Sequence, residues 1–191
     1  MDLGITGKSA FVAASTSGLG RASAAALAAD GARVGINGRT AASVDEAVAA
    51  LPGSIAIPGD ITDSDGRAGV IEAIGRELGG VDILVLNGPG PVPGLAADFT
   101  VELARDASDR LLVPHVDLVR AFLPGMRERG WGRIVLIGSS AVQAPSPNLV
   151  GSSAGRSAVA AYLKTLAAEV AADGVTVNAV LPGRIRTPRI E

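Results

Sequence analysis

Short apolar runs alternate along the chain with longer segments in which apolar residues recur at helical spacing. Several of the short runs are apolar at almost every position, as strands are when helices cover both faces of a parallel sheet. These runs predict strands at Ser9–Ala13, Arg33–Asn37, Ser54–Ile57, Asp82–Leu86, Gly132–Ile137 and Val175–Leu181. The longer segments predict helices near Leu19–Ala29, Thr40–Leu51, Ser64–Leu78, Leu103–Arg129 and Val150–Ala172.

The regular alternation of strand and helix predicts the fold class. Right-handed crossovers between successive strands give an α/β fold with a doubly wound parallel sheet and helices on both faces. Such sheets bind ligands beyond the carboxyl ends of their strands. A chain of 191 residues can bury one substantial core, so we expect a single domain over residues 1–191. The segment Gly88–Gly94, rich in proline and glycine, predicts a loop at a strand end and not a domain linker.

Composition and charge narrow the choice of partners. Alanine and glycine dominate the apolar residues and aromatic residues make up only 3%, which favours helices packed closely on a sheet. A net charge of −2 gives no electrostatic case for nucleic acid. The chain has no cysteine and one histidine, so we expect neither disulfides nor a metal site. Without a signal-like start or an apolar run of membrane-spanning length, we expect a cytoplasmic protein and no membrane partner.

The first candidate for chemistry is the glycine turn after the first predicted strand. Gly18 and Gly20 stand between that strand and an alanine-rich helical segment that begins at Arg21. The first turn of a helix has backbone N–H groups without partners, and a turn of small residues lets a phosphate approach them. The same Gly-x-Gly pair also fits a tight turn that binds nothing, so further features are needed to decide.

The end of the second predicted strand supplies one such feature. In dinucleotide sites an acidic residue about 20 positions after the glycine turn usually holds the ribose 2′-hydroxyl. Here Gly38 stands at that distance from Gly18, and Arg39 follows it with no carboxylate beside it. An arginine can bind a 2′-phosphate with two hydrogen bonds, whereas a carboxylate repels it. The pattern favours NADP(H) over NAD(H), the alternative being that Arg39 is a solvated surface charge.

With these features in place, the chain resembles the short-chain dehydrogenases/reductases, including 3-oxoacyl-ACP-reductase-like proteins, from Gly7 to Thr187. The turn Ser15–Gly20 resembles the cofactor turn of the family, and Asp60 matches the acidic residue that holds the adenine amino group. Asp82–Asn87 matches the fourth strand, Arg133–Ser140 the strand that ends in the active-site serine, and Val175–Gly183 the segment that cradles the nicotinamide carboxamide.

The resemblance implies a Rossmann-like fold, an NADP(H) cofactor and a small carbonyl or alcohol substrate. It also implies a homodimer or homotetramer that pairs the helical segments Leu103–Arg129 and Val150–Ala172 across a two-fold axis. The residues that it implies for cofactor binding are Ser15, Ser17, Gly18, Leu19, Gly20, Asn37, Arg39, Asp60, Ile61, Asn87, Gly88, Pro182, Gly183, Ile185 and Thr187.

The catalytic residues depart from the family pattern. The family uses a tyrosine as proton donor and a lysine four residues later, and Ser152 and Arg156 occupy those two positions here. A serine hydroxyl is a far weaker acid than a phenol, and arginine does not release its proton at neutral pH. The resemblance assigns the active-site serine to Ser140 or its neighbour Ser139. Ser140 stands 12 residues before Ser152, one fewer than is common, so both serines stay open.

Three further positions bear on the active site. Leu111, which has no polar group, occupies the place of a catalytic asparagine, and Ala14 replaces the first glycine of the turn. We expect Ala14 to tolerate an extended strand end and to weaken the site only slightly. His115, with a free pKa near neutrality, is a candidate replacement acid. We favour the alternative that it is a partly buried helix or interface histidine.

Three functions remain open on the sequence. The first is an NADP(H)-dependent reductase or dehydrogenase with an altered acid, and the second is a module that binds a dinucleotide without turnover. The third, a structural partner without nucleotide binding, conflicts with the retained Gly18, Gly20, Arg39, Asp60 and Thr187. Family members continue past the position of Thr187 into a substrate-covering segment and an edge strand. We therefore expect the domain to be incomplete at its C-terminus.

Overall fold

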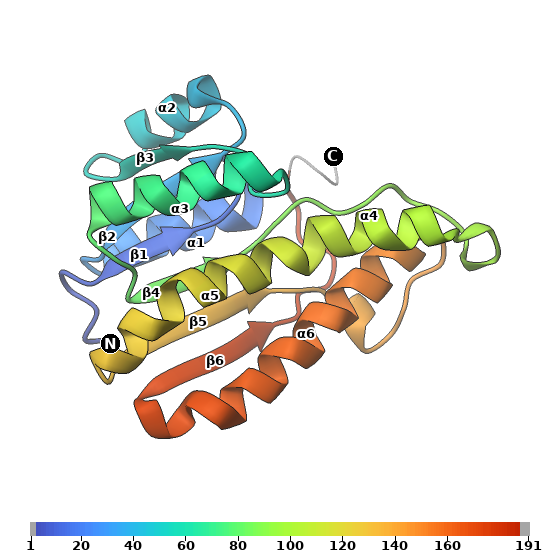
Figure 1. Ribbon diagram of the computed structural model, residues 1–191. Helices are drawn as coiled ribbons and strands as arrows, with labels where there is room; N and C mark the ends of the chain where they lie inside the picture. Colours follow the sequence, from blue (N-terminus) through green and yellow to red (C-terminus); the bar gives the residue numbers. More distant parts are fainter. Residues whose placement is uncertain (1–2, 188–191) are drawn as a thin grey trace.

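The computed structural model describes residues 3–187 and shows a six-stranded sheet in which all strands are parallel (Figure 1). The strand order is β3-β2-β1-β4-β5-β6. This arrangement confirms the predicted α/β fold with a doubly wound parallel sheet. The strands are β1 (Ser9–Val12), β2 (Arg33–Gly38), β3 (Ile55–Pro58), β4 (Ile83–Leu86), β5 (Gly132–Ile137) and β6 (Val175–Val180).

Helices cover both faces of the sheet and bury two separate apolar cores (Figure 1). Phe11 of β1 packs in the core under α3, α5 and α6, whereas its neighbours Ala10 and Val12 pack on the other face under α1 and α2. Successive side chains of a strand point to opposite faces, so an unbroken apolar run fills both cores. The helices are α1 (Gly18–Ala29), α2 (Ala41–Ala49), α3 (Ser64–Leu78), α4 (Val101–Leu111), α5 (Val113–Glu128) and α6 (Val150–Val170), with short 3₁₀ turns η1 (Ala96–Asp98), η2 (Ser140–Val142) and η3 (Ala171–Asp173).

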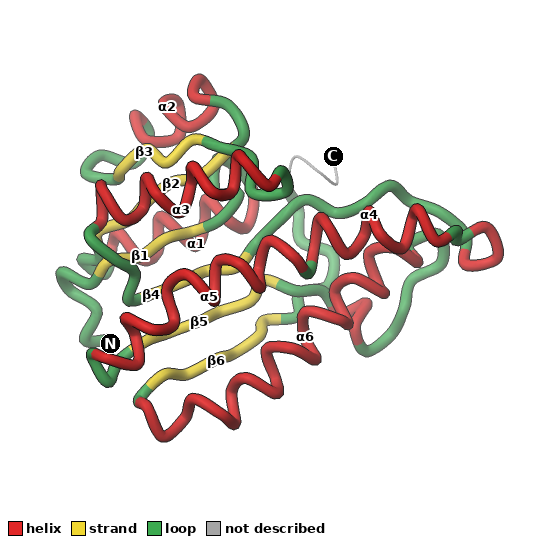
Figure 2. Tube along the Cα trace, viewed as in Figure 1, coloured by secondary structure: helices red, strands yellow, loops and turns green. Residues whose placement is uncertain are grey.

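The order of the strands reverses beside β1, which pairs with β2 on one side and with β4 on the other. The connections that leave β1 and β4 therefore diverge to opposite faces of the sheet, and a crevice opens where they part. Figure 2 shows the irregular segment after β4 running beside α4 to η1, before the chain turns back into α4. The topology places the candidate site at this end of the sheet.

One predicted helix is wrong in its extent. The segment Leu103–Arg129 forms two helices, α4 and α5, which part at Leu112. Pro114 causes the break, because it has no N–H to donate and its ring clashes with the carbonyl four residues earlier. Apolar residues continue at helical spacing through the break, so the periodicity alone did not reveal it.

At the opposite, amino end of the strands, Trp131 lies just before β5. The charged ends of Lys8 and Arg133 each lie 4.3 Å from the centre of its ring. A cation over an indole face is attracted by the ring electrons, so the three side chains form one packed unit. This packing gives the turn before β5 a structural role. No helix within residues 3–187 is long and apolar enough to cross a membrane.

Candidate functional site

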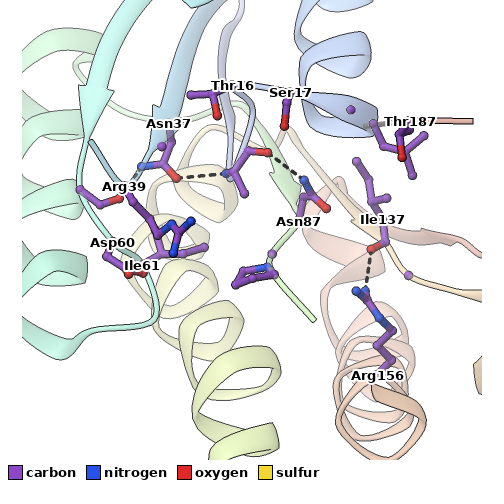
Figure 3. A pocket seen from close by; sticks show the side chains of 18 residues that line it. Thr16, Ser17, Asn37, Arg39, Asp60, Ile61, Asn87, Ile137, Arg156 and Thr187 are labelled. Atoms are coloured by element: carbon purple, nitrogen blue, oxygen red, sulfur yellow. Dashed lines mark hydrogen bonds between the residues drawn. The ribbon is translucent and has the colours of Figure 1, made fainter. Parts of the chain in front are cut away.

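A cavity of about 370 Å³ opens beyond the carboxyl ends of β1, β2, β4 and β5 (Figure 3). Many of the residues predicted for the site line it together, although they come from separate parts of the chain. The predicted residues in its wall are Ser17, Gly18, Leu19, Asn37, Arg39, Asp60, Ile61, Asn87, Gly88, Arg156 and Thr187.

The glycine turn shapes one wall of this cavity. Gly18 has a φ of +56° at the start of α1, a conformation that favours glycine. A Cβ on Gly20 would lie 2.4 Å from the Ala14 carbonyl oxygen and 2.8 Å from the Asn87 side-chain nitrogen. Gly20 therefore lets α1 pack against the ends of β1 and β4, although it does not itself line the cavity. The N-terminus of α1, with its free N–H groups, faces the cavity.

Asn37 ties the ends of three strands together. Its side-chain oxygen accepts a hydrogen bond from the Ala14 N–H at 3.1 Å, and its nitrogen donates to the carbonyls of Ile57 and Gly59. Ser15 lies directly beneath it and is fully buried: its hydroxyl donates to the Val12 carbonyl and accepts from the Asn37 N–H. Ser15 thus holds the turn in place and lies outside the cavity lining.

We expected Ala14 to end an extended strand, and this expectation was wrong. Ala14 has a φ of 47°, in the left-handed region. The turn requires this conformation because the Ala14 N–H must face Asn37 while its carbonyl accepts a hydrogen bond from Asn87 at 3.0 Å (Figure 3). An L-residue with a side chain is strained there by about 1 kcal/mol or more. Alanine in place of glycine therefore keeps the geometry of the turn and adds backbone strain.

One end of the cavity, which we call the adenine end, is built from Arg39, Asp60 and Ile61 (Figure 3). Partial burial raises the pKa of Asp60, but hydrogen bonds from Thr62 and the charges of Arg39 and Arg110 together hold it below its ordinary value. The carboxylate is therefore ionised and fixed in orientation, while the exposed Arg39 extends over it.

A buried arginine outside the cavity supports this end. Arg67 of α3 donates to the Ile61 carbonyl at 2.9 Å and pairs with Asp117 of α5 at 2.7 Å. It is 7% exposed, so water weakens these contacts little. Arg67 joins the Asp60–Ile61 segment to α5, and nothing in the sequence pattern had singled it out.

The other end of the cavity, which we call the reaction end, receives Arg156 from α6 (Figure 3). Arg156 is 9% exposed, and its guanidinium donates to the Ile137 carbonyl at 3.4 Å and to the Ser152 hydroxyl at 3.3 Å. The structure thus brings together the two residues at the family's tyrosine and lysine positions. Both donor–acceptor distances are long, which marks weak hydrogen bonds. Leu111, at the asparagine position, is fully buried.

The two candidate serines lie near this end but outside the lining. The Ser139 hydroxyl accepts a hydrogen bond from the Ala141 N–H at 3.2 Å and caps η2, whereas Ser140 is exposed. The Ser140 N–H donates to the Pro182 carbonyl at 3.0 Å, which ties η2 to the segment after β6. Gly183 and Ile185, on that segment, are exposed and also lie outside the lining. The assignment of an active-site serine stays a prediction.

Several lining residues were not among those predicted to bind a ligand. They are Ala14, Thr16, Gly38, Gly59, Pro89, Ile137 and Gly138. A Cβ on Gly38 would lie 2.4 Å from the Thr16 methyl group, so this glycine lets the turn and the end of β2 meet. Their position at the ends of predicted strands is the sequence feature that could have identified them as lining residues. Within residues 3–187 no cluster of three or more His, Asp or Glu side chains forms a metal site.

Comparisons with known proteins all place the chain in one protein family. The sequence profile of the short chain dehydrogenases matches residues 8–191. The chain is 34% identical over 188 residues to human dehydrogenase/reductase SDR family member 4, covering 96% of this chain and 68% of that protein. It is 34% identical over 194 residues to D-beta-hydroxybutyrate dehydrogenase of Rhizobium meliloti, covering 96% of this chain and 74% of that protein.

A solved structure is similar over the whole described fold. L-sorbose reductase from Gluconobacter frateurii, complexed with NADPH and L-sorbose, superposes with a TM-score of 0.93 at 31% sequence identity. The match covers 99% of this chain and 74% of the reductase chain.

Proposed function

Because this chain belongs to the short-chain dehydrogenase family, we propose that it is an NADP(H)-dependent oxidoreductase that interconverts a small carbonyl compound and its alcohol. The observation that carries the cofactor choice is Arg39, which follows the end of β2 in the cavity wall and has no acidic residue next to it in the sequence. The similar L-sorbose reductase is a complex with NADPH, which supports the same choice.

The residues at the adenine end fit a dinucleotide. The ionised Asp60 would accept a hydrogen bond from an adenine amino group, and Ile61 would pack beside the ring. Arg39 would donate to the 2′-phosphate, and the N–H groups at the N-terminus of α1 would bind the pyrophosphate. Asn37, which also lines the cavity, and Arg67, which does not, hold these groups in place through their hydrogen bonds.

A nicotinamide held at the reaction end would supply or accept the hydride. Arg156 provides a fixed positive charge and rigid donors that hold the cofactor ribose or an anionic group of the substrate. Ser140 or Ser139 orients the carbonyl oxygen. Neither Ser152 nor Arg156 is an acid of useful strength, so the proton comes from water, and we expect slow turnover of ordinary ketones.

A second candidate is a family member that binds the dinucleotide without turnover. The apolar Leu111 and the Ser152–Arg156 pair favour it, because the positions that normally handle the proton hold no acid. The two candidates agree on binding and differ only in chemistry.

Titration with NADPH and NADH tests the binding half. We expect tighter binding of NADPH, and Arg39→Ala should weaken NADPH selectively by roughly 1.5–3 kcal/mol through the loss of a charge-assisted hydrogen bond. Arg33→Ala is the matched control, because Arg33 is exposed at the other end of the same strand. Equal affinity of the unaltered chain for the two cofactors would contradict the proposed cofactor choice.

An assay against a panel of ketones and secondary alcohols tests the chemical half. Slow turnover with NADP(H) supports the oxidoreductase. NADPH binding with no turnover of any carbonyl or alcohol favours the binding module, and an absence of dinucleotide binding overturns both.

We also propose a homodimer or homotetramer that pairs the α4–α5 and α6 surfaces of two copies. Val101 and Leu103 of α4 are 60% and 41% exposed, which leaves apolar surface on this side of the molecule. Sedimentation at micromolar concentration should show a dimer or tetramer, and a monomer alone would contradict the assignment.

A further inference from the structure

The chain contains two Asn-Gly pairs, and both lie in the wall of the cavity. Asn37 and Gly38 form the end of β2, whereas Asn87 and Gly88 follow β4 and lie outside any strand. An asparagine side chain followed by glycine is open to attack by the next backbone nitrogen, because glycine has no Cβ to hinder the approach. The two pairs therefore share one chemical weakness in two different structural settings.

The reaction that uses this weakness needs no partner but water. The glycine nitrogen bonds to the side-chain carbonyl carbon Cγ, the Cγ–Nδ2 bond breaks, and Nδ2 leaves as ammonia with the proton of the backbone N–H. Water then opens the cyclic succinimide at one of its two carbonyl carbons, which leaves aspartate or isoaspartate. For the first step the side chain must rotate onto the next backbone nitrogen, so a side chain held by several hydrogen bonds in a strand is protected.

Asn37 is held in this way. It is 1% exposed, and its side chain accepts from the Ala14 N–H and donates to the carbonyls of Ile57 and Gly59. Its backbone carbonyl also accepts a hydrogen bond from the Ser15 N–H at 2.8 Å. Rotation of this side chain would break all three of its own hydrogen bonds, so we expect the first pair to be stable in the folded chain.

Asn87 is held much less firmly. Its side chain makes one hydrogen bond within residues 3–187, to the Ala14 carbonyl at 3.0 Å (Figure 3). The Gly88 N–H has no hydrogen-bond partner in the same part of the chain. A Cβ on Gly88 would meet nothing closer than 3.8 Å, the distance to the Arg110 carbonyl and to Nε2 of the buried His115. Asn87 is half-buried and lines the cavity, so water reaches it.

We propose that Asn87 is a site of spontaneous deamidation through the Gly88 nitrogen, which changes this part of the cavity wall from neutral to negative. A carboxylate only accepts, so it cannot replace the hydrogen bond that Asn87 donates to the Ala14 carbonyl. The new charge also repels the phosphates of a dinucleotide. The loss of cofactor binding rests on the proposed function, whereas the deamidation does not.

The first test maps the modification. The folded chain and the same chain unfolded in urea are incubated in warm, mildly alkaline buffer, and peptide mass spectrometry follows both Asn-Gly pairs. We expect both pairs to react in the unfolded chain, and only Asn87 in the folded chain. Gly88→Ala is the matched variant, because the Gly88 φ is not positive and a Cβ there has room; its Asn87 should react severalfold more slowly. An intact Asn87 in the folded chain, or equal loss at Asn37, overturns the proposal.

The second test measures the consequence for binding. Asn87→Asp has the charge of the product, and Asn87→Ala lacks the same hydrogen bond without the charge. We expect Asn87→Asp to bind NADPH about 10-fold more weakly than Asn87→Ala does. The incubated chain should lose NADPH binding in proportion to its deamidated fraction, and Gly88→Ala should lose less of its own starting affinity.

Equal NADPH affinity of Asn87→Asp and Asn87→Ala overturns the role of the charge. A freshly prepared, unaltered chain that binds no NADPH overturns the proposed function instead, and the peptide masses then decide on the deamidation alone.

Discussion

The two ends of the cavity differ in how firmly their polar groups are held. At the adenine end Asn37 of β2 bonds to the ends of β1 and β3, Thr62 donates hydrogen bonds to Asp60, and Arg67 donates to the Ile61 carbonyl. At the reaction end the hydrogen bonds from Arg156 to Ile137 and Ser152 are both long, and His115 Nε2 has no hydrogen-bond partner among the described residues. One cavity thus combines an end whose polar groups are joined by several hydrogen bonds with an end where the hydrogen bonds are long.

Under the proposed function, binding and chemistry depend on separate parts of the fold. The binding half rests on glycine turns and on networks that join several strands, so a change there disturbs the sheet itself. The chemical half rests on a few side chains of α5 and α6, which lie outside the sheet. A family fold therefore indicates the ligand site more firmly than it indicates the reaction.

The largest expected effect comes from restoring the family pair. Ser152→Tyr together with Arg156→Lys places a phenol and an ammonium on the same face of α6, at the reaction end. Carbonyl reduction with NADPH should rise by roughly 10²–10⁴-fold, the contribution of a general acid, as measured by kcat for simple ketones.

The matched control for this pair is Ser152→Phe with Arg156→Lys, which has the same ring without the hydroxyl. It should stay as slow as the unaltered protein. If the unaltered chain already reduces simple ketones as fast as the Tyr/Lys variant does, the reaction end is not chemically deficient and the comparison fails.

An intermediate effect concerns the buried ring of His115 and the stability of the fold. Its pKa falls from 6.5 to about 4 on folding, so between these values the unfolded chain binds a proton that the folded chain does not. The free energy of unfolding should therefore decrease as pH falls from 6.5 toward 4, by about 3 kcal/mol from this group. Urea unfolding at a series of pH values measures the slope.

His115→Asn removes this contribution, so its pH dependence should be shallower in the same window. An identical slope in the variant and the unaltered protein would show that the ring is not buried as a neutral group.

The smallest effect tests the strain in the binding half. Ala14→Gly relieves the positive φ and should raise the free energy of unfolding by about 1 kcal/mol. Ala13→Gly is the control: Ala13 is fully buried and its φ is not positive, so glycine there should destabilise the protein. Thermal unfolding of the two variants should shift in opposite directions, and a loss of stability in Ala14→Gly would contradict the assigned strain.

The fold was predictable because the alternation of apolar runs and helical segments is strong along the whole chain. The break between α4 and α5 was missed because apolar spacing continues across it, and only the missing N–H of Pro114 interrupts the helix. The left-handed Ala14 was missed because its conformation follows from contacts with Asn37 and Asn87, residues distant in sequence.

The candidate site was predictable to different extents at its two ends. Arg39 and Asp60 lie within two residues of the ends of β2 and β3, so the topology alone brings them together. Arg67 and the buried Nε2 of His115 depend on packing between helices, which local sequence does not encode. The roles of Ser139, Ser140 and the segment that contains Pro182 stay predictions.

The unit formed by Lys8, Trp131 and Arg133 has an optical consequence. Trp131 is the only tryptophan of the chain, and it lies at the opposite end of β5 from the cavity residues Ile137 and Gly138. Its emission is set by two flanking cations that come from the segment before β1 and from β5. A change in tryptophan fluorescence on adding a dinucleotide would therefore report a movement of the sheet, and not contact between the ligand and the indole.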